Sequence, residues 1–420
     1  MTSDARATAS VSELTRRRWL VLAASCLINL CVGSLYAWSV FAAPMAERLS
    51  ELAGAPVTGL AIVFTIANAV GPITMIGGGA VTRRLGPRAV VLAGGCLFAA
   101  GMVASGFATS KEMLMLTYGL GVGLGVGMVY GVTVSNSVKL FPDKKGLAGG
   151  LATASYGLSS VIVPPVANAL TASLGVASSF KVLGLAMLAL IVLASTQVVA
   201  VPDGFVPEGC SVAAGGAAPA VADRDWRQML ASPVFYVMIS MLLCGAFSGL
   251  MVTSSASPMA QAMVGMDASA AALAVSVLAL ANGAGRVAAG FMSDRLGAVA
   301  SLRITFVLLA AAMAALLACG GSVALFYVGL CLTGLCFGAV MGIYPGFTAA
   351  QFGARNNSVN YGIMFVGFAA AGFFGPQVMG ALLEATGGYA AAFGVACALA
   401  LLGVALSLVF SRMSGAGEPR

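Results

Sequence analysis

The chain has 420 residues, of which 60% are hydrophobic and only 8% are charged, and its mean hydropathy is +1.00. Soluble domains carry roughly 25% charged residues, so this composition excludes an ordinary soluble enzyme or binding module. Because lipid solvates an apolar exterior, the sequence predicts a membrane protein. The net charge of +7 follows from the topology argued below and requires no nucleic-acid partner.

Apolar segments of about 20 residues, the length that spans a bilayer, occur along the whole chain. The first extends from Trp19 to about Phe41, which is too long for the apolar core of a signal peptide. The fold class is therefore predicted as an all-α membrane protein with twelve transmembrane helices. The predicted spans are 19–41, 58–81, 88–108, 113–138, 146–170, 181–201, 233–255, 270–292, 303–319, 323–347, 361–383 and 390–411.

The distribution of Lys and Arg predicts the orientation of these spans. If the N-terminus is cytoplasmic, 17 of the 21 Lys and Arg residues fall in cytoplasmic segments and 3 in outer segments. Membrane proteins place excess Lys and Arg in their cytoplasmic loops, so we predict that both termini are cytoplasmic. The one remaining basic residue, Arg286, lies inside the eighth span.

A polar stretch rich in small residues separates the first six spans from the last six. We predict an N-terminal six-helix half at 1–201, a flexible cytoplasmic linker at 202–232 and a C-terminal six-helix half at 233–420. A short pattern after the second span recurs 211 positions later: Gly79, Arg84 and Gly86 match Gly290, Arg295 and Gly297. Two parallel six-helix repeats are typical of one large class of transporter folds.

Arg286 is the only ionisable side chain that the sequence places deep in a span. The 14 acidic residues all fall in loops or at span ends, so none is expected to pair with it at depth. A charged residue in hydrocarbon costs at least ~2.5–3.5 kcal/mol. Arg286 is thus expected either to bind an anionic substrate in a central cavity or to extend toward the interface near Ser293, about 10 Å along the helix.

Tyr36, Tyr130 and Tyr156 lie in the first, fourth and fifth spans, too deep for the usual interfacial tyrosine. Their hydroxyls are expected either to donate hydrogen bonds to a carboxylate or to be incidental to core packing. Asn29, Asn68 and Asn282 are also intramembrane, and interhelical hydrogen bonding is the expected role.

Neither a catalytic nor a cofactor-binding constellation is evident. The chain has no His, and no cysteine spacing indicates a metal, so we expect no cofactor. Alternate glycines from Gly119 to Gly127 match a nucleotide-binding pattern on paper, but they lie in an apolar span without the required strand. Close approach of membrane helices is the better interpretation of these glycines.

Two loops carry a pattern that resembles a known family. Residues 79–88, Gly-Ala-Val-Thr-Arg-Arg-Leu-Gly-Pro-Arg, and residues 290–297, Gly-Phe-Met-Ser-Asp-Arg-Leu-Gly, look like the loop motif of the major facilitator superfamily. Such loops normally latch the two conformations of the carrier. Asp294 keeps the usual acidic residue, whereas Arg83 replaces it in the first copy, so the first latch is expected to work differently.

Nearly the whole chain also resembles the oxalate/formate antiporter family, which neighbours the monocarboxylate transporters. The most specific segment is Phe141–Ala148; the others are Tyr36–Ser39, Val129–Gly131, Tyr156–Leu158 and Asn360–Gly362. The resemblance implies that Arg286 binds the substrate carboxylate and that Tyr36, Tyr130 and Tyr156 line the cavity.

The departures from this family indicate a different substrate. Oxalate carriers have a second cation, a lysine, which falls at Phe368 here. Their cavity tryptophans fall at Phe337 and Phe365, and a tyrosine falls at Met341. The proton-accepting Asp of animal monocarboxylate carriers falls at Asn282. One fixed positive charge in a more apolar cavity favours a monoanion over a dianion.

We therefore expect a secondary transporter of small monocarboxylates, such as lactate, pyruvate or formate, that works by alternating access through proton coupling or exchange. Oxalate/formate exchange is the first alternative. A non-transporting membrane sensor is the second, and it would need an output domain. The expected partners are a small carboxylate anion and, in the symport case, a proton. The protein is expected to be a monomer in the lipid bilayer of a bacterial inner membrane. The predicted substrate-binding residues are Arg286, Tyr36, Tyr130, Tyr156, Phe337, Met341, Phe365, Phe368 and Asn282.

Overall fold

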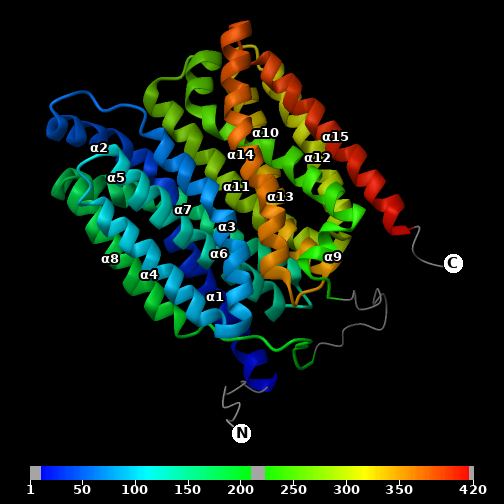
Figure 1. The fold of residues 1–420 in the computed structure, drawn as a ribbon. Helices are drawn as coiled ribbons and strands as arrows, with labels where there is room; N and C mark the ends of the chain where they lie inside the picture. The colour runs from blue at the N-terminus through cyan, green and yellow to red at the C-terminus, as the bar shows by residue number, and fades with distance from the viewer. Residues whose placement is uncertain (1–10, 210–222, 416–420) are drawn as a thin grey trace.

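The computed structural model describes residues 11–209 and 223–415. Within them the chain contains twelve helices long and apolar enough to cross a membrane, which confirms the predicted all-α class and span number. Figure 1 shows the first six spans side by side and the last six beside them. We call the end of the bundle where α8 (Val176–Ser195) ends and α10 (Pro233–Val264) begins the linker end.

The first six spans are built from ten helical segments. They are α1 (Val11–Val32), η1 (Gly33–Ala37), α2 (Trp38–Ala53), α3 (Ala61–Leu85), α4 (Pro87–Ser105), α5 (Lys111–Leu114), the π-helical η2 (Met115–Val122), α6 (Gly123–Leu140) and α7 (Lys145–Leu174), together with α8. The short α9 (Trp226–Leu230) lies in the predicted linker. The last six spans are α10, α11 (Ala268–Leu296), α12 (Ala298–Leu317), α13 (Val323–Phe352), α14 (Asn357–Thr386) and α15 (Ala390–Gly415).

The first span is longer than its predicted limits of 19 and 41. Helical structure continues from Val11 to Ala53 without a break in the span, with a 3-10 turn at η1 and Pro44 inside α2. The length of an apolar run in the sequence reflects the thickness of the bilayer and not the full length of the helix. Charged residues such as Glu13 and Glu47 therefore end the apolar run while the helix continues into the aqueous boundary.

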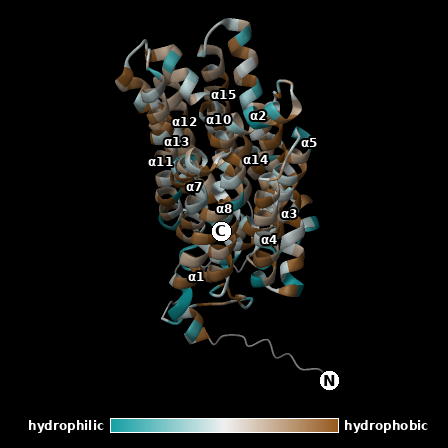
Figure 2. Cartoon of the chain, turned by 90° about the vertical axis from the view of Figure 1, so that its left-hand side faces the viewer, coloured by the Kyte–Doolittle hydropathy of each residue, from teal (hydrophilic) through white to brown (hydrophobic). Residues whose placement is uncertain are grey.

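The exterior of the bundle is apolar, as a lipid solvent requires. Figure 2 shows hydrophobic residues along the helices and hydrophilic residues mainly toward the two ends. Large apolar side chains are exposed on the outer helices, among them Leu185, Leu193, Val307 and Leu401. A soluble protein rarely exposes so continuous an apolar surface.

Glycines allow the interior helices to approach one another closely. A Cβ atom added at Gly125 would lie 2.6 Å from the backbone nitrogen of Phe98, and one at Gly123 would lie 2.7 Å from the Cα of Ala67. Real Cβ atoms do not approach so closely, so α6 can pack against α4 and α3 only because these positions lack side chains. The structure confirms the packing interpretation of the glycines in the fourth span.

Candidate anion-binding site

Arg286 lies near the middle of α11 and is only 3% exposed. Its Nε donates a hydrogen bond to Oδ1 of Asn282 at 2.9 Å, and its Nη1 donates to the carbonyl oxygen of Thr153 on α7 at 2.7 Å. The guanidinium therefore joins α11 to α7 in the interior and does not extend to the interface. Asn282 bonds to its own helix, so the expectation of an interhelical bond for this residue is wrong.

Within the part of the chain that the structure describes, no carboxylate balances the charge of Arg286. The ion pairs formed by the described residues are Glu13 with Arg17, Arg18 with Asp143, and Asp203 with Arg355. A guanidinium has five N–H donors; the two hydrogen bonds above use two of them, and the Tyr130 hydroxyl lies close enough to the group to bond with it. A buried charge without a counter-charge is costly, so this position is suited to an anion that arrives from outside the protein.

Glycines hold the guanidinium against α7 and α11 against α13. A Cβ atom at Gly157 would lie 3.2 Å from the Cζ of Arg286, so the absence of a side chain there makes room for the planar group. A Cβ atom at Gly342 would lie 2.8 Å from the Cα of Arg286. The site is thus positioned by closely packed helices and not by a loop.

The three predicted tyrosines gather beside this charge. The ring centroids of Tyr36 and Tyr156 are 5.4 Å apart, and those of Tyr130 and Tyr156 are 4.8 Å apart. All three are close enough to Arg286 to interact with it electrostatically. Each hydroxyl can donate a hydrogen bond, so the cluster offers several neutral donors around a single cation.

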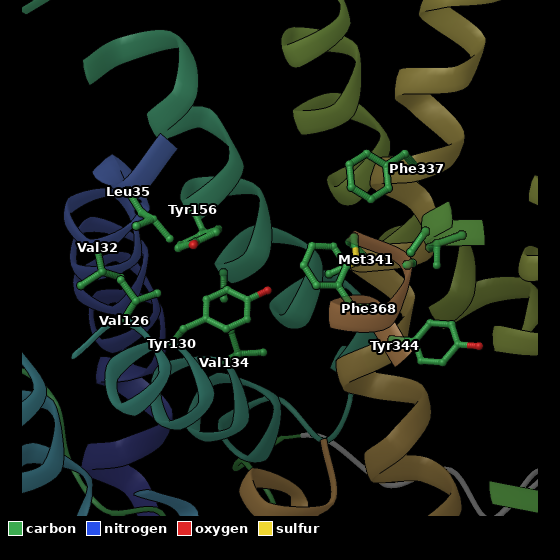
Figure 3. Close-up of a cluster of buried hydrophobic side chains, with 14 of the residues drawn as sticks. Val32, Leu35, Val126, Tyr130, Val134, Tyr156, Phe337, Met341, Tyr344 and Phe368 are labelled. Atoms are coloured by element: carbon green, nitrogen blue, oxygen red, sulfur yellow. The ribbon is translucent and has the colours of Figure 1, made fainter. Parts of the chain in front are cut away.

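Apolar side chains from the last six spans face the tyrosines. Figure 3 shows Tyr130 and Tyr156 on one side and Phe337, Met341 and Phe368 on the other, with the Tyr130 hydroxyl directed toward the apolar side. The rings of Phe337 and Phe368 are stacked with centroids 6.4 Å apart. Phe365 joins the two sides: its centroid is 4.5 Å from that of Phe368 and 5.7 Å from that of Tyr130.

A cavity of about 30 Å³ lies among these residues, lined by Tyr36, Tyr130, Tyr156, Phe365 and Phe368 with neighbours from α3 and α6. It has room for about two water molecules. Arg286, Asn282, Phe337 and Met341 do not line it. The predicted residues are therefore neighbours in one interior region, although only five of them share a wall of this cavity.

Asn68 and Tyr361 belong to this region but were absent from the predicted set. Asn68 lines the cavity, and its amide donates a hydrogen bond to Phe64 of its own helix at 2.9 Å, not to another helix as expected. The fully buried Tyr361 hydroxyl lies beside the Tyr130 hydroxyl and interacts with it. Both are polar side chains inside predicted spans, and this polarity is the sequence feature that could have placed them in the region.

Asn29 bridges helices as expected, because its side-chain amide donates a hydrogen bond to the carbonyl oxygen of Ala152 on α7 at 2.9 Å.

The sequence matches the family model described as the Major Facilitator Superfamily over residues 26–376 and again over 243–419. The chain belongs to the major facilitator superfamily. Its members are transporters and not enzymes, and the observed helical architecture agrees with this assignment.

The oxalate:formate antiporter of Oxalobacter formigenes is 28% identical over 97% of this chain and 94% of its own length. Monocarboxylate transporter 13 of Rattus norvegicus is 28% identical over 78% of this chain and 74% of its own. The fold is similar to that of the transporter FucP in its outward conformation, with a TM-score of 0.69, 16% identity, and coverage of 94% of this chain and 99% of that one.

Proposed function

We propose that this superfamily member carries small organic monocarboxylates, such as lactate, pyruvate or formate, across the membrane. The observation that supports this most is the arginine itself: Arg286 is buried, held by neutral groups and beside a cluster of tyrosines. In the proposed complex Arg286 binds the carboxylate through its free donors, and the tyrosine hydroxyls donate to the same group.

Charge matching favours one negative charge on the substrate. A monocarboxylate bound at Arg286 leaves a neutral pair, whereas oxalate leaves one negative charge unpaired in an interior of low dielectric constant, which is costly. The apolar wall of Phe337, Phe365 and Phe368 cannot stabilise that second charge. It can instead contact the methyl group or hydrocarbon end of a short monocarboxylate.

The same arrangement supports alternating access. The residues come from both sets of six helices: the tyrosines from η1, α6 and α7, and the arginine and apolar wall from α11, α13 and α14. We propose that the N-terminal half, 1–201, and the C-terminal half, 233–420, rock about this site, with both termini in the cytoplasm and the chain in a bacterial inner membrane. Occupation neutralises Arg286 and so lowers the cost of occluding the site, which favours exchange or proton-coupled symport over return of the empty carrier.

Oxalate/formate exchange is the second candidate, because a relative of 28% identity is named as an oxalate:formate antiporter. The two candidates differ in the charge that the site must hold. Formate exchange is compatible with both, so oxalate is the diagnostic substrate.

Proteoliposomes loaded with unlabelled substrate distinguish them. We expect saturable uptake of labelled lactate into lactate-loaded vesicles and at least tenfold slower uptake of labelled oxalate into oxalate-loaded vesicles. Vesicles without protein provide the background. Saturable oxalate exchange without lactate uptake would reject the monocarboxylate proposal in favour of the oxalate one.

A further inference from the structure

Asp294 fastens the two sets of six helices together at the linker end. Its Oδ1 accepts a hydrogen bond from the backbone N–H of Gly146 at 2.7 Å, and its Oδ2 accepts from that of Leu147 at 2.8 Å. These amides begin α7, in the first six spans, whereas Asp294 lies on α11 in the last six. A carboxylate at a helix N-terminus is favourable because it meets unpaired amides and the positive end of the helix dipole.

The internal repeat predicts a matching contact 211 positions away. Asp294 corresponds to position 83, and Gly146 and Leu147 correspond to Asn357 and Ser358 at the start of α14. The corresponding helices do cross closely here: a Cβ atom at Gly79 would lie 2.9 Å from the backbone of Ser358. The matching carboxylate is nevertheless missing.

Arg83 occupies the position of that carboxylate and cannot accept a hydrogen bond. Its Nη1 instead donates to Oδ1 of Asn356, the residue before α14, at 2.7 Å. The start of α14 therefore receives a positive charge from the first loop, which is the unfavourable sign for a helix N-terminus.

A carboxylate from the linker lies close to this place. Oδ1 of Asp223 accepts a hydrogen bond from the backbone N–H of Arg355 at 3.0 Å, two residues before α14 begins. The contact is close, because a Cβ atom at Gly353 would lie 2.7 Å from the Cα of Asp223. Asp223 is thus seated in the turn between α13 and α14.

Arg224 extends this contact through its backbone. Its N–H donates to the carbonyl oxygen of Phe352 at 2.9 Å. Its carbonyl oxygen accepts from the side-chain amides of Asn356 at 3.1 Å and Asn360 at 3.0 Å. The linker is therefore bonded to the end of α13 and to the first turn of α14.

The same turn is also held from the first six spans. Nζ of Lys139, on α6, donates to the carbonyl oxygen of Arg355 at 3.0 Å. The Arg355 side chain forms an exposed ion pair with Asp203, from the beginning of the linker, at 3.1 Å. Described parts of the linker on both sides of residues 210–222 thus bind residues between 352 and 360, so these parts are held by the protein rather than flexible.

We propose that Asp223 supplies the carboxylate that the first loop lacks, so that the linker forms part of the closure at the linker end. In this arrangement α7 is fastened by Asp294 and the start of α14 is fastened by Asp223 and Arg224. Opening of the linker end separates α14 from α3 and therefore breaks the contacts that Lys139 of α6 and Asp203 after α8 make with Arg355, whereas Asp223 stays with the turn. This inference does not depend on which substrate is carried.

Hydrogen–deuterium exchange of the full-length protein in detergent tests the proposal without substrate. Asp223→Ala is expected to speed exchange of the backbone amides of residues 355–360 about fivefold, the effect of losing one partly exposed, charge-assisted hydrogen bond. Asp225→Ala is the matched control. It removes the same charge two residues away, from a carboxylate that caps α9 through Arg227 and Gln228.

A second substitution tests the equivalence of the two positions. Adding Arg83→Asp to Asp223→Ala returns a carboxylate to the first loop, and exchange at residues 355–360 is expected to come back to within about twofold of the native rate. Equal exchange in the Asp223→Ala and Asp225→Ala variants would overturn the role of Asp223. Continued fast exchange in the double variant would overturn its equivalence to the missing loop carboxylate.

Discussion

Replacing Arg286 with Gln is expected to reduce carboxylate uptake at least about 30-fold, because truncating one member of a buried charge pair costs 2–5 kcal/mol or more. Gln keeps a polar amide near Asn282 and Thr153, so the helix contacts are largely preserved. Lys at this position is expected to recover little, since a point charge cannot reproduce the fixed donors that reach Asn282, Thr153 and the substrate together. Lactate uptake in proteoliposomes measures the effect.

Arg303→Gln is the matched control for this variant. Arg303 is another arginine of the last six spans and is partly buried, but its side chain bonds to Ser407 and Ser411 on α15, away from the tyrosine cluster. We expect near-native lactate uptake in Arg303→Gln. The melting temperatures of Arg303→Gln and Arg286→Gln are expected to be similar. Native uptake in Arg286→Gln would show that the arginine has only a structural role.

Introducing Lys at Phe368 is expected to change the preferred charge of the substrate. Phe368 lines the cavity opposite the tyrosines, so a lysine there adds a second cation to the same space. An empty site then holds two unpaired charges, and a dianion can neutralise both. We expect oxalate exchange to rise at least tenfold and lactate uptake to fall by a similar factor, measured in the same vesicles.

Phe368→Leu provides the comparison, because it changes the ring without adding a charge. It is expected to retain the preference for lactate and to alter the KM modestly through the lost contact with Phe365 and Phe337. If Phe368→Lys and Phe368→Leu show the same ratio of oxalate to lactate transport, charge matching at this position does not set the specificity.

Most of the architecture was predictable because the bilayer imposes one strong rule. Every span must be apolar and about 20 residues long, so the number of spans can be counted directly. The ends of the helices follow other rules: α1 and α2 continue through polar residues from Val11 to Ala53. Capping and helix propensity decide such extensions, and hydropathy does not measure them.

The interior region was partly predictable. Arg286 can be identified from the sequence because it is the one Lys or Arg residue that lies inside a predicted span. Asn282 is four residues earlier, on the same helix face, where i and i+4 side chains meet. Asn68 and Tyr361 were missed as members of the region because hydropathy does not show which face of a span is turned inward. The contacts of Asp223 depend on tertiary structure that no local periodicity in the linker reveals.

The position of a bound monocarboxylate tests the central proposal most directly. We expect crystals of the protein soaked with 3-bromopropionate to show an anomalous bromine peak beside Phe337, Phe365 and Phe368, with the carboxylate within hydrogen-bond distance of Arg286 and of the tyrosine hydroxyls. A carboxylate bound elsewhere in the bundle, with Arg286 still bonded only to Asn282 and Thr153, would contradict this account.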